Sequence, residues 1–354
     1  MRICILGGSP QQWGGLESYC DRAHRALAPF SPVWLPSQTA YMRLSRLKDV
    51  GRSLRQLQIL QRDGLDVVWL QLSNLPDLVY LLWARLLRLP VIVTPHFGSN
   101  SRLQTKPLRR GLIKTLLRQA DALGLLFAGQ EREIELPAGP KRHVVGTFLP
   151  QASLSLTAGS DGAVLTLLHA ARFSREKGSF LTVDLCRALA DRGIAFSARL
   201  VGRADAETMR ALADAIADAG LGDRITIIDW LGEEELQSAL RQTDVLVHLS
   251  LLDAYPLIVL EALAGGAVPI VCPMAGAVSM VDRYGGRVVE GHDPARDAAD
   301  WLASLSLDDL RAQGRRAAVA VRADYDWAVC AQQVVDIATT VLADLRTPAA
   351  PPGD

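Results

Sequence analysis

Short apolar runs alternate with amphipathic stretches along most of the chain. The runs are rich in leucine and β-branched residues; they are Arg2–Leu6, Val33–Leu35, Val67–Gln71, Val91–Thr94, Ala122–Phe127, Val164–Ala171, Phe196–Gly202, Arg224–Gly232, Asp244–Ser250 and Val268–Cys272. Such runs are typical of strands buried on both faces. Between them, helical periodicity predicts helices over about 18–28, 44–61, 107–119, 179–192, 207–219, 233–242, 256–264 and 327–345. The alternation predicts an α/β protein with parallel sheets covered by helices on both faces.

The pattern breaks once, which divides the chain into two domains. Residues 148–162 are polar and rich in Ser, Gly and Ala, and the alternation of strand and helix restarts after them. A length of 354 residues suits two domains that each bury a core. We therefore predict domains over 1–152 and 163–325. The helix at 326–346 is expected to pack back toward the first domain, and the Pro/Ala-rich tail 347–354 is expected to be disordered.

Composition indicates a soluble, cytoplasmic protein. The sequence is 49% hydrophobic and 21% charged, as in folded domains. Its five cysteines are scattered without metal-like spacing, which favours reduced thiols. The most apolar stretch, 78–93, is broken by Arg85, Arg88 and Pro90, so it is too short to span a membrane. No metal site is predicted, because Asp324-Tyr-Asp326 directly precedes a helix and is interpreted as a cap.

A net charge of zero conceals an asymmetry between the two halves of the chain. Residues 1–120 hold 17 basic and 6 acidic residues, and the remainder holds 21 basic and 32 acidic residues. The helix predicted over 107–119 carries Leu108, Leu112, Ile113, Leu116 and Leu117 on one face, and its bases Arg109, Arg110, Lys114 and Arg118 lie on or beside the other. These bases are either the solvated side of a core helix or a contact with an anionic membrane surface. Nucleic acid ranks below membrane, because no recognition module is present and only 6% of residues are aromatic.

The most informative stretch runs from Leu249 to Val271 and reads as loop, helix and strand after a buried strand. Pro256 is predicted as the first helical residue, and Gly265-Gly266 as the C-terminal cap. Asp253 lies in the loop and Glu261 lies on the helix eight residues later. Unpaired N–H groups of Leu257 and Ile258 would bind anionic oxygens, and the carboxylates would accept bonds from sugar hydroxyls. The alternative is an ordinary strand–helix unit with solvated acids.

Three further places carry candidate chemistry. Arg172 and Lys177 share one loop at the end of a strand, where two cations can hold a diphosphate. A glycine-rich turn, Gly7 to Gly15, follows the first strand; it lacks the dinucleotide and P-loop spacings, and glycine there alone favours a tight turn. His96 directly follows the strand Val91–Thr94, where a lone histidine is either structural or catalytic.

These motifs together resemble retaining glycosyltransferases of family 4, which have the GT-B fold. The family's E-x₇-E signature is matched at Ser250, Tyr255, Pro256, Leu257, Glu261, Ala262, Ala264, Gly266 and Pro269, with Asp253 in place of the first Glu. Gly14-Gly15-Leu16-Glu17 matches G-G-x-E, and Ala171 to Gly178 matches G-R-x-x-x-x-K-G except at its first residue. Val201-Gly202 resembles the family's V/I-G-x-G, whereas Gly146-Thr147-Phe148 departs from the usual Asn-Gly.

The resemblance implies two Rossmann-like doubly wound domains facing a central cleft, with the donor held by the second domain. The reaction would transfer a sugar from a nucleotide sugar with retention, without a metal or other cofactor. Arg172 and Lys177 would neutralise the leaving diphosphate, and His96 would lie near the transferred sugar. Donor contacts would come from Gly15, Gly202, Trp230, Leu231, Asp253, Tyr255, Pro256, Leu257, Ile258 and Glu261.

The basic N-terminal half suggests a lipid-linked glycan acceptor at the cytoplasmic face of the inner membrane, in the synthesis of a cell-surface polysaccharide. Two other readings stay open. A GT-B epimerase or phosphorylase fits less well, since no lysine stands in a pyridoxal-phosphate context and the paired motifs are not the epimerase pattern. A catalytically weakened homologue that binds a glycan or nucleotide as a scaffold is supported by Asp253.

Overall fold

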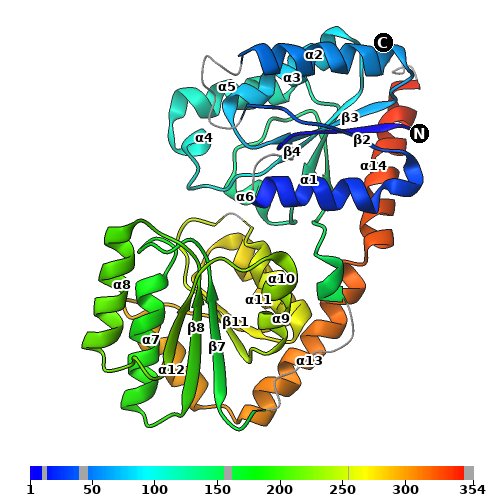
Figure 1. The fold of residues 1–354 in the computed structure, drawn as a ribbon. Helices are drawn as coiled ribbons and strands as arrows, with labels where there is room; N and C mark the ends of the chain where they lie inside the picture. Colours follow the sequence, from blue (N-terminus) through cyan, green and yellow to red (C-terminus); the bar gives the residue numbers. More distant parts are fainter. Residues whose placement is uncertain (10–13, 40–46, 155–161, 254, 347–354) are drawn as a thin grey trace, which may run out of the picture. The chain divides into compact units, whose positions relative to one another are not determined.

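The computed structural model describes residues 1–9, 14–39, 47–154, 162–253 and 255–346 (Figure 1). It divides into two compact units, Met1–Phe148 with Tyr325–Asp354, and Leu149–Asp324. The chain enters the second unit before residue 152, because the short helix η4 (Gln151–Leu154) bonds to that unit: Arg241 donates to the carbonyl of Ala152 at 3.2 Å. Residues 155–161 of the predicted linker and the tail 347–354 lie outside the described residues.

The first unit contains a six-stranded parallel sheet in the order β2-β1-β3-β4-β5-β6. Its strands are β1 (Ile3–Leu6), β2 (Val33–Leu35), β3 (Val67–Leu72), β4 (Val91–Pro95), β5 (Ala122–Leu125) and β6 (Lys141–Val144). The first, third, fourth and fifth of these are buried throughout, as their apolar sequences require. The edge strand β6 is polar and largely exposed, so it gave no apolar signal in the sequence.

Helices cover both faces of this sheet (Figure 1). One face packs against α2 (Leu47–Arg62), α3 (Leu78–Leu86) and α5 (Pro107–Leu117), whose buried residues join strand residues in one core. The helix α1 (Gly15–Ala26) contacts α14 (Trp327–Arg346), so the C-terminal helix belongs to the first unit. Two short helices, α4 (Arg102–Thr105) and α6 (Gln130–Glu133), follow β4 and β5.

The C-terminal helix α14 is the most membrane-like helix in length and composition among those of the described residues. Among the helices in the described ranges, it alone is long and apolar enough to cross a membrane, and a third of its most apolar window is buried. Cys330, Val334 and Val341 are among the side chains it buries in the unit. Asp326 begins it as predicted, since the carboxylate accepts from the N–H groups of Ala328 at 2.9 Å and Val329 at 3.4 Å.

The second unit repeats the architecture with the strand order β12-β11-β10-β7-β8-β9, all parallel. Its strands are β7 (Leu165–Ala170), β8 (Phe196–Val201), β9 (Ile225–Ile228), β10 (Val245–His248), β11 (Val268–Val271) and β12 (Arg287–Val288). The two-residue edge strand β12 was not predicted, because two residues carry no periodic signal.

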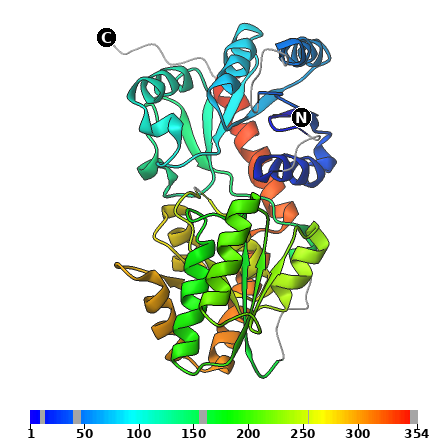
Figure 2. The ribbon, with the colours of Figure 1, turned by 60° about the vertical axis from the view of Figure 1, so that its left-hand side comes forward.

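One face of this second sheet packs against α7 (Ser179–Asp191), α8 (Ala206–Asp218) and α12 (Pro294–Ala303), as Figure 2 shows. The remaining helices of the unit are α9 (Glu233–Arg241), α10 (Leu257–Gly265), α11 (Ala275–Tyr284) and α13 (Leu307–Asp324). Helix α10 contacts α9, α11 and α13, which explains why seven of its nine residues are buried.

Two local predictions need correction. Pro256 is the N-cap of α10 rather than its first residue: its backbone is extended (ψ 99°) and its carbonyl accepts from Val259 at 3.0 Å. The apolar face predicted for α5 is also only partly inside, since Ile113 and Leu117 are buried but Leu108 is 90% exposed and Leu112 46%. The predicted cap at Gly266 is confirmed, with a left-handed backbone (φ 91°).

Candidate active site

Two loops of the second unit lie side by side because they follow neighbouring parallel strands. β7 pairs with β10, so the loop 171–178 and the residues 249–253 leave the same edge of the sheet. The N–H of Leu251 donates to the carbonyl of Glu176 at 2.8 Å. Gly178 allows this approach, because its backbone is left-handed (φ 79°) and a side chain there would collide with the carbonyl of Leu249. The glycine of the predicted phosphate loop is therefore required for packing as well.

Lys177 and Asp253, both predicted site residues, meet across these loops. The Lys177 Nζ lies 2.5 Å from Asp253 Oδ1, and His248 Nε2 lies 3.0 Å from Asp253 Oδ2. The side chains of Lys177 and Asp253 are 19% and 22% exposed, and that of His248 is 6% exposed. Burial alone raises the pKa of Asp253, but the bond and charge of His248 and the ammonium of Lys177 hold the pKa well below its usual range. Asp253 is thus a carboxylate fixed by two donors.

A buried histidine, His169, connects the two strands of this site to the loop that carries Lys177. Its Nδ1 lies 3.0 Å from the carbonyl of Val247 and its Nε2 lies 3.1 Å from Ser179 Oγ. A carbonyl only accepts, so Nδ1 carries the proton and Nε2 accepts from Ser179, whose oxygen in turn accepts from the N–H of Ser174 at 3.2 Å. Burial lowers the pKa of His169 to about 4. This neutral histidine links β7 and β10 to the loop that carries Lys177.

Sequence reasoning missed both His169 and His248. Each is a buried polar residue of a largely apolar strand: His169 lies in β7, and His248 is the last residue of β10. That interruption is the signal that could have found them, because a buried polar side chain needs a specific partner.

Arg172, the other predicted diphosphate ligand, stands at the start of the same loop. It is exposed, and it makes no ion pair or hydrogen bond within the part of the chain that the structure describes. A guanidinium in this position offers its donors to a ligand.

Gly202 brings the neighbouring strand β8 close to this loop. A side chain at Gly202 would collide with the carbonyl of Ala171, and Phe173 donates its N–H to the carbonyl of Arg203 at 2.9 Å. Trp230 and Leu231 follow β9, the next strand along the sheet, and Trp230 is 62% exposed. The ends of β7, β8 and β9 therefore share one edge, where open α/β sheets bind ligands.

The first turn of α10 follows the loop that carries Asp253. The side chain of Glu261, which lies further along this helix, is buried. Tyr255, Leu257 and Ile258 are partly exposed around the first turn. Glu261 is only 6% exposed, and its Oε2 accepts from Gln237 Nε2 of α9 at 2.9 Å. Asp253 and Glu261 thus have separate partners.

Two predicted residues, Gly15 and His96, lie in the first unit. Gly15 begins α1 and is exposed, with open space where a side chain would extend. His96 follows β4, and its Nε2 lies 2.8 Å from Gln71 Oε1. The ring of Tyr19 packs edge-on at 4.8 Å, and burial lowers the pKa of His96 to about 3. His96 is therefore a neutral, firmly oriented histidine, and its partner Gln71 was not singled out from the sequence.

The bases of α5 divide into two pairs. Arg110 and Lys114 both contact Glu135, at 3.3 Å and 3.2 Å. Arg109 and Arg118 are exposed and have no ion pair within the described ranges. The exposed apolar side chains Leu108 and Leu112 lie on the same helix.

Two family models match this chain. "Glycosyl transferase 4-like domain" matches residues 1–146, and "Glycosyl transferases group 1" matches residues 158–320. Together they cover most of both units.

Curated relatives bear similar names. The chain is 26% identical over 265 residues to GDP-mannose:cellobiosyl-diphosphopolyprenol alpha-mannosyltransferase of Xanthomonas campestris, covering 73% of this chain and 70% of that protein. It is 34% identical over 121 residues to D-inositol 3-phosphate glycosyltransferase of Corynebacterium diphtheriae, covering 33% of this chain and 28% of that protein.

Solved structures show the same fold at lower identity. HepE of Anabaena, solved in complex with UDP and glucose, aligns with a TM-score of 0.73 at 15% identity, over 96% of this chain and 100% of HepE. Sucrose-phosphate synthase of Thermosynechococcus elongatus aligns with a TM-score of 0.71 at 18% identity, over 97% of this chain and all of that one. With both halves matched by family models, the chain belongs to glycosyltransferase family 4 and is a glycosyltransferase with the GT-B fold.

Proposed function

We propose that this protein is a retaining, metal-independent hexosyltransferase that uses a UDP- or GDP-sugar and a lipid-linked glycan acceptor in cell-surface polysaccharide synthesis. The observation that carries the proposal is the pairing of Lys177 with Asp253 at the shared edge of β7 and β10. A cation for a diphosphate and a carboxylate for a sugar hydroxyl stand next to each other there. A nucleotide sugar carries its diphosphate and its sugar hydroxyls in adjacent positions.

In this proposal Lys177 and Arg172 stabilise the charge that develops on the leaving diphosphate. The N–H groups at the start of α10 add the positive end of a helix. Asp253 accepts from hydroxyls of the transferred sugar, and Glu261 accepts from the ribose. A carboxylate accepts several hydrogen bonds at once, so the bond from Gln237 to Glu261 is compatible with that role.

The neighbours of Asp253 favour transfer on one face of the sugar. Asp253 forms hydrogen bonds with a lysine and a histidine. No second carboxylate is paired with it in the described parts of the chain. Double displacement needs a free nucleophile, whereas Asp253 is held at both oxygens. We therefore assign removal of the acceptor proton to the leaving phosphate.

A lipid-linked acceptor is supported by the surface of α5. Leu108 is 90% exposed beside Arg109, and Arg118 lies one helix length away. Exposed leucine next to basic residues suits the boundary between lipid headgroups and acyl chains. The protein would accordingly work in the cytoplasm, at the inner face of the membrane.

Thermal unfolding in the presence of UDP, GDP, ADP, CMP and their sugars tests the proposal. A ligand at 100 times its dissociation constant stabilises the fold by about 2.7 kcal/mol. We expect one nucleotide and its sugar to raise the melting temperature of the wild type, to raise that of Lys177→Ala much less, and to act normally on Arg296→Ala. Arg296 is an exposed base on α12 and serves as the matched control.

Two results would contradict the proposal. If no nucleotide stabilises the wild type, a scaffold that binds glycans becomes a better description of the protein than a transferase. If a nucleotide binds but its sugar is never transferred to any acceptor in a membrane extract, a nucleotide-binding scaffold is the better description.

A further inference from the structure

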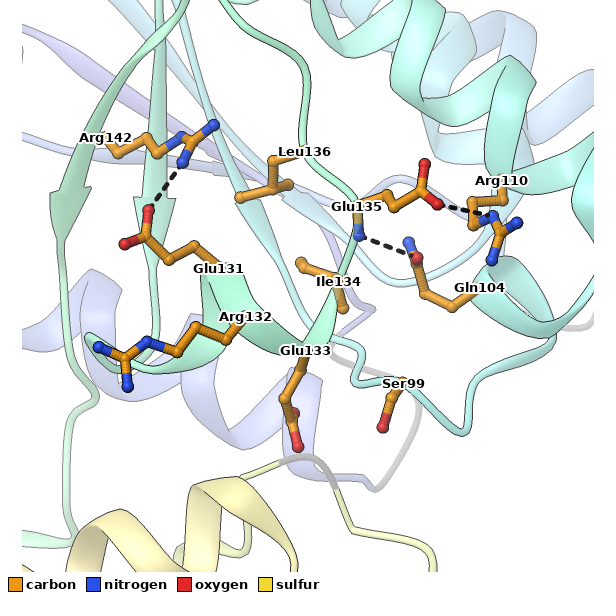
Figure 3. Close-up of a pocket in the computed structure, with 10 residues that line it drawn as sticks. All are labelled: Ser99, Gln104, Arg110, Glu131, Arg132, Glu133, Ile134, Glu135, Leu136 and Arg142. Carbon is orange, nitrogen blue, oxygen red and sulfur yellow. Dashed lines mark hydrogen bonds and ion pairs between the residues drawn. The ribbon is translucent and has the colours of Figure 1, made fainter.

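Buried glutamines hold loops in place in the first unit. Gln104 lines a cavity there, and its Oε1 accepts from the backbone N–H of Glu135 at 3.1 Å (Figure 3). Gln130 likewise accepts from the backbone N–H of Leu126 at 2.8 Å. Gln237, on α9 of the second unit, is only 1% exposed and differs from these two, because both ends of its amide bond to side chains.

The hydrogen-bonding chemistry fixes which way the amide of Gln237 faces. Its two ends lie 2.9 Å from Glu261 Oε2 and 2.5 Å from Ser153 Oγ. A carboxylate only accepts hydrogen bonds, so the NH₂ group of Gln237 donates to Glu261, and its Oε1 accepts from the hydroxyl of Ser153. All three side chains are buried. A chain of hydrogen bonds thus runs from Ser153 to the carboxylate that is assigned above to the ribose.

The other end of this chain is the segment by which the backbone enters the second unit. Ser153 belongs to η4, which contacts α9 and α10. Two arginines hold the backbone of η4: Arg241 of α9 donates to the carbonyl of Ala152 at 3.2 Å, and Arg322 of α13 donates to the carbonyl of Ser153 at 3.2 Å. The orientation of Glu261 and the position of η4 therefore depend on each other through Gln237.

We propose that Gln237 is a positioning residue, which holds the carboxylate of Glu261 for the hydroxyls of the donor ribose and links that carboxylate to η4. A buried carboxylate that loses a donor turns away or takes up a proton, and a protonated acid has fewer acceptor sites for hydroxyls. A ribose bound to Glu261 should in turn stabilise the bonds of Gln237 and Ser153. The inference rests on the function proposed above, because the ribose is that of the nucleotide-sugar donor.

Calorimetry with nucleotides that carry or lack the ribose hydroxyls tests the inference. GDP is compared with dideoxy-GDP and UDP with dideoxy-UDP, on the full chain. We expect the wild type to bind one ribonucleotide about tenfold or more tightly than its dideoxy form, because the hydroxyls donate to a charged acceptor. In Gln237→Met this ratio should fall to about threefold or less, since the carboxylate is no longer held. Gln242→Met, at an exposed glutamine that ends the same helix, should keep the wild-type ratio.

Hydrogen exchange of η4 measures the link in the unchanged protein. The amides of residues 152–154 should exchange about threefold or more slowly with the ribonucleotide bound than with its dideoxy form bound at the same saturation. Ser153→Ala should abolish this difference, because alanine cannot donate a hydrogen bond to Gln237. The wild-type measurement keeps the inference testable if Gln237→Met fails to fold.

Three results would overturn the inference. They are equal binding of the two nucleotide forms by the wild type, a ratio that Gln237→Met leaves unchanged, and exchange of residues 152–154 that does not depend on the ribose hydroxyls. If Gln237 only supported the fold, its loss would weaken both nucleotide forms equally and the ratio would stay. The absence of binding by both GDP and UDP would contradict the donor function and this inference together, so the two failures are distinguishable.

Discussion

At the scale of single residues, Asp253 is the least expected feature of the site. Its side chain is one methylene shorter than the Glu of the family pattern, yet both oxygens are engaged, by Lys177 at 2.5 Å and by His248 at 3.0 Å. The short side chain is thus matched by donors that reach it. If Lys177 binds a diphosphate, its ammonium group must interact with both the diphosphate and Asp253.

Asp253→Asn should therefore separate nucleotide binding from sugar transfer. Without the carboxylate, Lys177 is fully available to the diphosphate, so the free nucleotide should bind about threefold to tenfold more tightly. Transfer should fall by about two orders of magnitude or more, because an amide binds the sugar hydroxyls less strongly than a charged acceptor. Calorimetry with the nucleoside diphosphate and turnover of its sugar measure the two effects. A parallel loss of both would mean that Asp253 only supports the loop.

His169 leads to a prediction about pH. Its pKa is about 6.5 in the unfolded chain and about 4 in the fold, so below pH 6.5 the unfolded state binds the extra proton first. The fold should therefore lose stability as the pH falls from 6.5 to 4, by about 3 kcal/mol from this residue.

The His169→Gln variant tests that prediction, because it cannot take up this proton. It should be less stable than the wild type at pH 7.5, and the difference should shrink toward pH 4. Urea unfolding, read at β7 and β10 by pulsed hydrogen exchange, measures the second unit alone. His292→Gln, at an exposed position, should run parallel to the wild type. A constant difference across the range would show that His169 is charged in the fold or is not buried.

At the scale of elements, strands that are apolar throughout could be predicted and polar ones could not. The buried strands β3, β4 and β10 appear in the sequence within one or two residues of their bounds. The edge strand β6, Lys-Arg-His-Val, has no buried face to impose an apolar pattern. For α5, periodicity identified the helix but overestimated its buried face, because Leu108 lies at its exposed beginning.

The candidate site shows the same division. The motifs singled out Lys177 and Asp253 individually, but their contact depends on β7 lying next to β10, which pairs residues far apart in the sequence. His248 and His169 act within that contact, so only the fold reveals their roles. Glu261 is a similar case: its spacing from Asp253 is local, whereas its bond to Gln237 comes from packing of α10 on α9.

At the scale of the whole molecule, charge is unevenly distributed along a neutral chain. The first 120 residues, all in the first unit, carry a net charge of +11. Part of this charge is already compensated, since Arg110 and Lys114 share Glu135. Arg109 and Arg118 have no ion pair within the described ranges, so their charges are available to an external partner. They lie on the same helical segment as the exposed Leu108 and Leu112.

This distribution predicts which bases matter for membrane binding. The wild type should sediment with vesicles that contain anionic lipid, and the bound fraction should fall as salt is raised, because screening shortens the reach of the charges. Each base near the surface contributes about 1 kcal/mol, so the double variant Arg109→Gln/Arg118→Gln should bind about tenfold or more weakly. The matched variant Arg110→Gln/Lys114→Gln should lose less, because Glu135 already offsets those charges. Leu108→Asp should weaken binding, whereas Val319→Asp, at an exposed apolar residue of α13, should not.

Equal losses in the two double variants would mean that total charge attracts the protein without a docking face on α5. Equal binding to neutral vesicles would remove the electrostatic argument altogether.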